Sequence, residues 1–246
     1  MCAITLDVDW APDFVIDDVA NLLIEAGVRA VWFVTHDSPA VRRLRTYPEL
    51  FEIGIHPNFL PGSTHGNSES EVLAHCMSIV PEARMVRTHG LVQTSNLLQR
   101  IVAETPVQVD LSLFLPHARN VEPVTYYWEG GETLHRIPYV WEDDFEIVRP
   151  NPDWELSGIM KGNSGLVILD FHPIHVYLNS NSLQPYRIIR ALGNLTSVTK
   201  SQVDAVVCTG IGVRSAFIRA IEFIRAAPGP SLLELGIAGS VESPDG

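Results

Sequence analysis

The sequence has few cysteines, little positive charge and no long apolar run, and each absence removes a class of protein. Its three cysteines, Cys2, Cys76 and Cys208, are widely separated and form no C-x-x-C pair, which indicates a reduced chain without a disulfide framework. The net charge is -12, from 17 basic and 29 acidic residues, so neither nucleic acid nor an anionic membrane surface is expected as a partner. No apolar stretch approaches the roughly 18 residues that a membrane-spanning helix needs, so no membrane insertion is expected.

Several familiar signatures are also missing. The first ten residues, MCAITLDVDW, have no basic residue and reach an acidic one by Asp7, so we expect no signal peptide and a cytoplasmic location. The sequence has neither a G-x-S-x-G elbow of serine hydrolases nor a Walker phosphate loop. The run Gly210-Ile211-Gly212 lacks the rest of a dinucleotide-binding fingerprint. We interpret it as a turn into the last helix.

What the sequence does have is a regular alternation of short apolar runs with amphipathic stretches. The expected strands are residues 2–8, 29–35, 51–56, 83–88, 106–113, 165–171 and 203–208. Strands that alternate with helices predict a parallel sheet, either doubly wound or closed into a barrel. We expect a single α/β domain at residues 1–228, a distorted (β/α) barrel of about seven strands, followed by a weakly ordered C-terminal tail at residues 229–246.

Polar residues collect at the expected carboxyl ends of the strands, where β/α barrels carry their active sites. Six strand ends supply Asp7 and Asp9; Thr35, His36 and Asp37; His56; Arg87, Thr88 and His89; Asp110 and Ser112; and Asp170, His172 and His175. Strand ends are wet in any barrel, which explains one or two such positions. Histidine or arginine at most of them indicates a functional site.

The segment LDVDW gives the clearest chemical signal. Because side chains alternate along a strand, Asp7 and Asp9 are expected to point to the same face. Burying two neighbouring carboxylates is costly unless a cation lies beside them. A divalent metal with Asp and His ligands meets that need. The alternative, that one of the two caps the next helix, is weaker because Asp13 and Asp17 are available for capping.

Four segments occur at successive strand ends in the order TLDVD, EIGIHP, RTHG and LDFHP. In this order they resemble the motifs of the polysaccharide deacetylase (NodB-homology) superfamily, from Thr5 to Pro173, in a divergent branch. The resemblance implies a distorted β/α barrel that hydrolyses amide-linked acyl groups with a divalent metal.

The resemblance also implies a role for each matched residue. Asp7 would be the general base and Arg87 the residue that orients it. His172 would be the general acid, which protonates the leaving amine. Asp9 and His56 would be metal ligands.

Two departures from the family pattern leave roles open. Val8 separates two aspartates that are adjacent in many members, so the base and the ligand could be exchanged. Leu60 stands where the family usually has a second histidine ligand. We therefore expect the third ligand to be His65, whose Pro-Gly-Ser-Thr loop can fold back, and the remaining candidates are His36, His89 and Asn58.

Zinc is the first choice for a mixture of imidazole and carboxylate ligands, and iron, cobalt or manganese fits the same set. The residues expected to contact substrate are His89, Trp141, Glu142, Asp143 and His175. Trp141 could stack on a sugar ring while the acids after it bind hydroxyls or the amine product. A solvated acidic loop and a packed His175 are the alternatives.

Together these features predict a metal-dependent N-deacetylase, an amide hydrolase that acts on an N-acylated amino sugar such as a precursor in surface-polysaccharide biosynthesis. The substrate would be a small molecule or an oligosaccharide. Two alternatives stay open: an amidohydrolase of a small non-sugar amide, which would lack aromatic platforms, and a catalytically inactive sugar-binding barrel. The missing histidine favours the inactive barrel, and the intact acid–base residues oppose it. The oligomeric state stays open.

Overall fold

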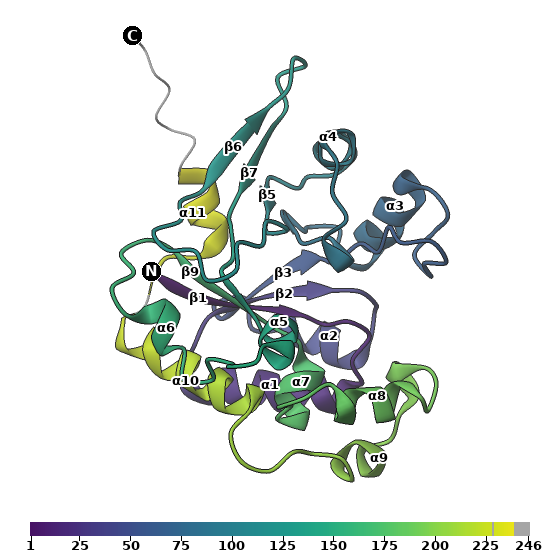
Figure 1. The fold of residues 1–246 in the computed structure, drawn as a ribbon. Coiled ribbons are helices and arrows are strands. Elements are labelled where there is room, and N and C mark those ends of the chain that lie inside the picture. Colours follow the sequence, from purple (N-terminus) through teal and green to yellow (C-terminus); the bar gives the residue numbers. More distant parts are fainter. Residues whose placement is uncertain (228, 239–246) are drawn as a thin grey trace.

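The computed structural model describes residues 1–227 and 229–238, which form an α/β domain around one mixed sheet (Figure 1). The strands are β1 Cys2–Asp7, β2 Ala30–Val34, β3 Phe51–Ile55, β4 Met85–Val86, β5 Val109–Asp110, β6 Val124–Tyr127, β7 Thr133–Arg136, β8 Trp141–Glu142 and β9 Val167–Phe171. Their order in the sheet is β6-β7-β5-β4-β3-β2-β1-β9-β8. All neighbouring pairs are parallel except β6 with β7. The sheet is curled, and its end strands β6 and β8 do not pair with each other, so the barrel is incomplete.

The predicted α/β class and distorted barrel are confirmed, with nine strands rather than about seven in the described part of the chain. The expected strand at 203–208 is wrong, because residues Lys200–Asp204 form helix α9. Thr199 and Gln202 make a capping box at its start, and this local signal outweighs the β-branched run that follows. The additional strands β6, β7 and β8 lie in the irregular stretch between residues 115 and 155.

The helices fill the connections between the strands. They are α1 Asp13–Ala26, α2 Pro39–Leu44, α3 Glu69–Ile79, α4 Ser95–Glu104, α5 Asp143–Val148, α6 Ser157–Met160, α7 Pro173–Leu178, α8 Gln184–Arg190, α9, α10 Val213–Ala226 and α11 Leu232–Ala238, with short 3₁₀ turns η1 His89–Leu91 and η2 Leu195–Ser197. Helices α1, α7 and α10 pack together, and α10 contacts β1 and β9 (Figure 1). Among the described residues, no helix combines the length and the apolar character that crossing a membrane requires.

The central strands form the core. All five residues of β2 are buried, and so are all five of β9. Parallel strands covered on both faces are expected to be almost entirely hydrophobic. Asp170 in β9 is the exception, and it is completely buried. A charged-type residue in the centre of the sheet requires a partner, and that partner belongs to the site described below.

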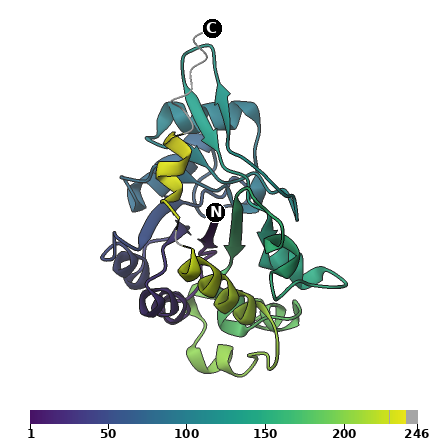
Figure 2. The same cartoon turned by 90° about the vertical axis from the view of Figure 1, so that its left-hand side faces the viewer.

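The C-terminal segment differs from the expected weakly ordered tail. Residues Leu232–Ala238 form helix α11, which contacts β5 and β7 and lies beside the β6–β7 hairpin (Figure 2). Leu232 is buried, and a Cβ atom added at Gly236 would come within 2.6 Å of Val109. The described part of this segment therefore belongs to the packed domain. The rest of the expected tail, residues 239–246, and the expected domain boundary at 228 lie outside the described residues.

The packing of α11 can be tested with Leu232→Ala. Because the side chain is 2% exposed, we expect a loss of about 2 kcal/mol in the free energy of unfolding, the low end for a buried leucine. Urea denaturation would measure it. The matched control is Leu192→Ala, whose side chain is 52% exposed and whose effect should stay within about 0.5 kcal/mol. Equal, small effects of both variants would mean that α11 adds nothing to stability.

Candidate active site

Six chemically active side chains converge at the carboxyl ends of four strands that lie close together in the sheet. They are Asp7 and Asp9 after β1, His56 after β3, Arg87 and His89 after β4, and His172 after β9. In the sheet order β4-β3-β2-β1-β9, the four strands are separated only by β2. Parallel pairing brings their carboxyl ends to the same edge. Residues that the sequence presents at separate strand ends are therefore neighbours in space.

Asp9 reaches the site through a turn rather than through the strand. Strand β1 ends at Asp7, and Asp9 and Trp10 have φ angles of 45° and 58°. Left-handed backbone at non-glycine residues costs of order 1–3 kcal/mol each and occurs mainly where the surrounding structure enforces it. Here the amide of Trp10 donates to Thr35 Oγ1 at 3.0 Å, and the amide of Ala11 donates to the Val8 carbonyl at 2.8 Å. The expected strand alternation thus does not place Asp9; this strained turn does.

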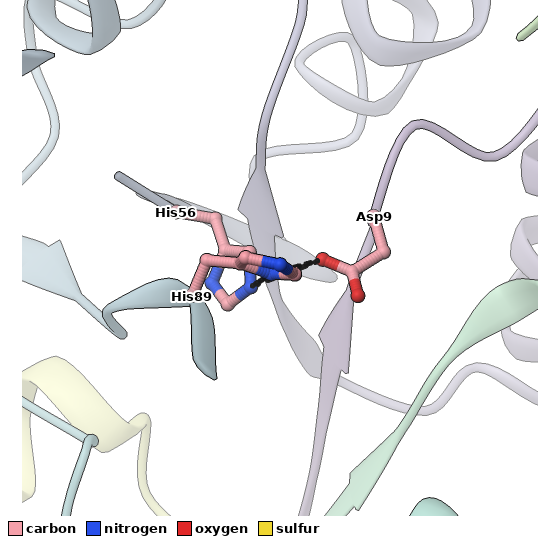
Figure 3. A group of neighbouring side chains, drawn as sticks. All are labelled: Asp9, His56 and His89. Carbon is pink, nitrogen blue, oxygen red and sulfur yellow. Dashed lines mark hydrogen bonds and ion pairs between the residues drawn. The ribbon is translucent and has the colours of Figure 1, made fainter. Parts of the chain in front are cut away.

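Asp9, His56 and His89 point their ligand atoms at one another (Figure 3). His56 Nε2 is 3.2 Å and His89 Nδ1 is 3.0 Å from Asp9 Oδ1, and the two nitrogens are 3.3 Å apart. Two ligands at about 2.1 Å from a tetrahedral ion lie about 3.4 Å apart. The three separations therefore fit one face of a divalent-metal coordination shell, which leaves a fourth position open.

The orientation of His56 is fixed by a hydrogen bond on its far side. Its Nδ1 donates to the Arg87 carbonyl oxygen at 2.7 Å, so Nε2 is the ring atom that faces Asp9. In the protonated ring Nε2 donates to the carboxylate, and in the neutral ring its lone pair is free to bind a metal ion. Burial alone would raise the pKa of Asp9, but hydrogen bonds from His56 and His89 hold that pKa well below its usual range. The Asp9 carboxylate is thus charged and faces two imidazole nitrogens, a donor set that suits zinc and similar ions.

Arg87 lies between the two other buried carboxyl groups, Asp7 and Asp170. Its Nη1 donates to Asp7 Oδ1 at 3.0 Å and to Asp170, and its Nε donates to the Leu111 carbonyl at 2.9 Å. Burial lowers the pKa of Arg87, but the two carboxyls raise it above its ordinary value. Burial raises the pKa of Asp170 well above its usual range despite the arginine. Arg87 is therefore a fixed positive charge directly beside Asp7.

His172 is held from its other side by Asp143. The ring Nδ1 donates to Asp143 Oδ1 at 2.6 Å, and the His172 amide donates to Oδ2 at 2.7 Å. Burial lowers the pKa of His172, but Asp143 and Asp144 raise it well above its ordinary value. The ring is thus a cation whose Nε2 lies 3.6 Å from Asp9 Oδ2. Asp143, expected to contact substrate, is completely buried and supports His172 instead.

His65, expected to be the third ligand, is not brought into the group. Its Nδ1 accepts from the Asn58 amide at 3.2 Å, and its ring stacks on His75 with centroids 4.8 Å apart. His89 occupies the corresponding position beside His56. His89 was one of the remaining candidates in the sequence analysis. It lies within reach because β3 and β4 are neighbours in the sheet, and residue spacing along the chain does not reveal which strands are neighbours.

Two other expected substrate contacts are buried. Trp141 is 0% exposed and packs on Phe171, with ring centroids 4.8 Å apart, so it presents no surface to a sugar. His175 is also buried, and its Nε2 donates to Asp144 at 2.8 Å. Glu142 is half-buried and accepts from the Tyr139 hydroxyl at 3.2 Å. Burial raises the pKa of Glu142 to about 7.

Trp10 supplies an aromatic surface that the sequence analysis did not single out. Its half-buried ring lies 5.3 Å from the ring of His89 and 5.4 Å from that of His65. The same tryptophan lines a cavity of about 810 Å³. Other residues of the cavity wall are Phe14, Arg42, Asn58, Arg190 and Asn194. A cavity of this size is in the range of small-molecule sites. Asp9, His56 and His89 do not line it, and Trp10, whose ring contacts His89, lies between the cavity and the group.

The chain is similar to known proteins in both sequence and fold. The WbmS-like polysaccharide deacetylase family model matches residues 4–190. Among solved structures, a proposed polysaccharide deacetylase involved in O-antigen biosynthesis from Bordetella bronchiseptica is 32% identical, with a TM-score of 0.76 and 90% of each chain covered. No curated protein matches significantly in sequence.

Two weaker likenesses were also found among solved structures. A family 4 acetyl xylan esterase from Clostridium thermocellum, in complex with cobalt, is 15% identical with a TM-score of 0.42, and the match covers 87% of this chain and 95% of that one. The peptidoglycan deacetylase PdaC from Bacillus subtilis is 13% identical with a TM-score of 0.41, covering 92% and 83%.

The buried environment of His65 predicts an acid-sensitive contribution to stability. Burial lowers the pKa of His65 from 6.5 to about 4 in the folded protein. Below pH 6.5, His65 is therefore protonated in the unfolded chain while it stays neutral in the folded chain. Stability is therefore lost as pH falls from about 6.5 to about 4, by about 2 kcal/mol at pH 5. His65→Gln should remove this loss in urea denaturation at pH 7.5 and pH 5 with a chelator present.

The control for this measurement is His75→Gln, which replaces an exposed histidine of the same region and should keep most of the acid-induced loss. If wild type and His65→Gln lose the same stability between the two pH values, His65 titrates normally in the folded protein and its described environment is wrong.

Proposed function

Because the chain belongs to the WbmS-like polysaccharide deacetylase family, we propose that it is a metal-dependent N-deacetylase that hydrolyses the amide of an N-acylated amino sugar. The observation that carries the proposal is the group of Asp9, His56 and His89, whose ligand atoms are 3.0 to 3.3 Å apart. It lies beside Asp7 and His172, a carboxylate and a cationic imidazole suited to opposite proton transfers. The relative described as acting in O-antigen biosynthesis supports a surface-polysaccharide precursor as the substrate.

Asp9, His56 and His89 would hold the metal ion, with zinc as the first choice. A divalent ion at this position would polarise the acyl carbonyl and lower the pKa of water. The assignment of Asp9 rather than Asp7 as the ligand rests on their partners. One oxygen of Asp9 faces both imidazoles, whereas Asp7 Oδ1 accepts from Arg87.

Asp7 would take the proton from the attacking water. Its Oδ1 is held by Arg87, and its Oδ2 is 3.6 Å from His56 Nε2, so the second oxygen faces the metal group. The planar guanidinium, stacked between Phe33 and Tyr139 at 4.8 and 4.4 Å from the ring centres, cannot rotate away. A lysine would supply the charge without this fixed direction.

His172 would give a proton to the leaving amine. Its Nδ1 is held by Asp143, so the proton available for transfer is on Nε2, which points to the Asp9 side of the site. Asp143 therefore keeps the ring charged and oriented, as a carboxylate does for a catalytic histidine in other hydrolases.

Trp10 and its cavity support a sugar over a small non-sugar amide. The expected stacking residue, Trp141, is buried, but the half-buried ring of Trp10 contacts His89 and lines a cavity of about 810 Å³. Asparagine and arginine side chains in the same wall can hydrogen-bond to hydroxyl groups. Asp7, Arg87 and His172 are all present beside the proposed metal ligands. Their presence argues against an inactive sugar-binding barrel.

The ligand assignment predicts the metal content of four variants. Protein purified with Asp9→Ala, His56→Ala or His89→Ala should lose bound metal, because each change removes one of three ligands. His65→Gln should retain about one ion per chain. Elemental analysis after gel filtration measures the content. Metal lost in His65→Gln but retained in His89→Ala would show that the third ligand is the one expected from the sequence.

The acid–base assignment predicts selective loss of turnover. Asp7→Asn and His172→Gln should each reduce acetate release from N-acetylated amino-sugar oligosaccharides by about 10²- to 10⁴-fold, while metal content is unchanged. The control Glu155→Gln changes an exposed acid that pairs with Arg219 and should be fully active. If Asp7→Asn loses the metal and Asp9→Asn keeps it, the two aspartates have exchanged roles.

A further inference from the structure

A second group of ligand-type side chains lies next to the first. Glu142, Asp144 and His172 each offer one atom, and these atoms lie within 4.8 Å of one another. They come from the end of β8, the first turn of α5 and the end of β9. The proposed reaction uses His172 but gives no task to the two acids.

Each member of this group is oriented by a partner behind it. Asp143 holds His172 at 2.6 Å, His175 holds Asp144 at 2.8 Å, and the Tyr139 hydroxyl holds Glu142 at 3.2 Å. His175 is in turn hydrogen-bonded to Ser180. Partners of this kind, which fix a ligand from its far side, are characteristic of metal sites.

The imidazole of His172 aims an unpaired nitrogen into the group. The residue is 6% exposed, and with Nδ1 held by Asp143 only Nε2 is free. In the described part of the chain no hydrogen bond to Nε2 is found, and Asp9 Oδ2 at 3.6 Å is beyond hydrogen-bonding distance. This nitrogen carries the ring proton, so a metal ion that binds there would release that proton to solvent.

The third possible group, Asp7, Asp170 and His172, already has its cation. Arg87 donates to both of these aspartates, so the arginine occupies the space that an ion would need. No arginine or lysine contact is found for Glu142 or Asp144 among the described residues. The charged group beside Asp144 is the imidazolium of His172, and a divalent ion that displaced the ring proton would replace it as the counter-charge.

We propose that Glu142, Asp144 and His172 form a second divalent-cation site. Asp9 would stand between the two ions, with Oδ1 toward His56 and His89 and Oδ2 toward His172. The second site is the weaker one, because its ligand atoms are spread over up to 4.8 Å and the side chain of Asp144 is 48% exposed.

Occupation of this site would take the Nε2 atom that donates the proton in the proposed reaction. An ion bound there would therefore inhibit the enzyme, a consequence that rests on the proposed function. The site itself rests only on the arrangement of the three side chains.

The test is a zinc titration of the full-length, metal-stripped protein by isothermal calorimetry. Wild type should bind two ions with different affinities. The double variant Glu142→Gln/Asp144→Asn should bind one, with the affinity of the tight site changed less than about threefold. Asp144→Asn alone, at a half-exposed position, should weaken the second ion at least tenfold. The control Glu155→Gln/Glu222→Gln removes two exposed acids next to Arg219 and should still bind two ions.

A second readout identifies the nitrogen. In protein with ¹⁵N-labelled histidine, the second equivalent of zinc should shift the Nε2 resonance of His172, and this shift should be absent in the double variant. Wild type that binds a single ion at Asp9, His56 and His89, or a double variant that still binds two, would overturn the second site and leave the proposed function intact. Wild type that binds zinc only through Glu142, Asp144 and His172 would support the second site and overturn the proposed function.

Discussion

The buried guanidinium of Arg87 holds both halves of the candidate site in place. Its side chain donates to Asp7 and Asp170 inside the sheet, and its carbonyl oxygen accepts from His56 and so directs the ring toward Asp9. Removing one partner from a buried ion pair costs about 3–5 kcal/mol, since the charge left behind is unsolvated. The same residue thus holds the proposed base, Asp7, through its side chain and a proposed metal ligand, His56, through its backbone. The end of strand β4, which positions Arg87, therefore also sets the distance between Asp7 and His56.

The parts of the site that could be predicted from the sequence are those set by position along a strand. Asp7, His56 and His172 follow apolar runs directly, and the carboxyl-end rule assigns them to one edge from the sequence alone. A side chain that is buried in a turn or behind a strand cannot be recognised in this way, because no apolar run in the sequence marks its position. Trp141 and Asp143 stand in an acidic, aromatic segment that looks exposed, yet both are completely buried, because that segment pairs with β9 at the end of the sheet.

The fold shows the same division between local and long-range information. Six of the expected strands are present because each is a short, apolar run between helix signals. The predicted strand at 203–208 failed because a capping box at Thr199 starts a helix that the β-branched residues alone would not suggest. The neighbour order of the strands is a long-range property, and it decides that His89 in the turn after β4, rather than His65 on the loop after β3, meets His56.

Leu60 lies close to the turn that presents His89, the proposed third ligand. Leu60 occupies the position where the family usually has a histidine, and its Cδ1 lies 3.5 Å from where a Cβ on Gly90 would be. Gly90 has a φ of 61°, a conformation that favours glycine, and it directly follows His89. The leucine therefore lies against the turn that presents His89, the proposed third ligand. Leu60 contributes packing to this turn, and His89 contributes the nitrogen that faces Asp9 and His56.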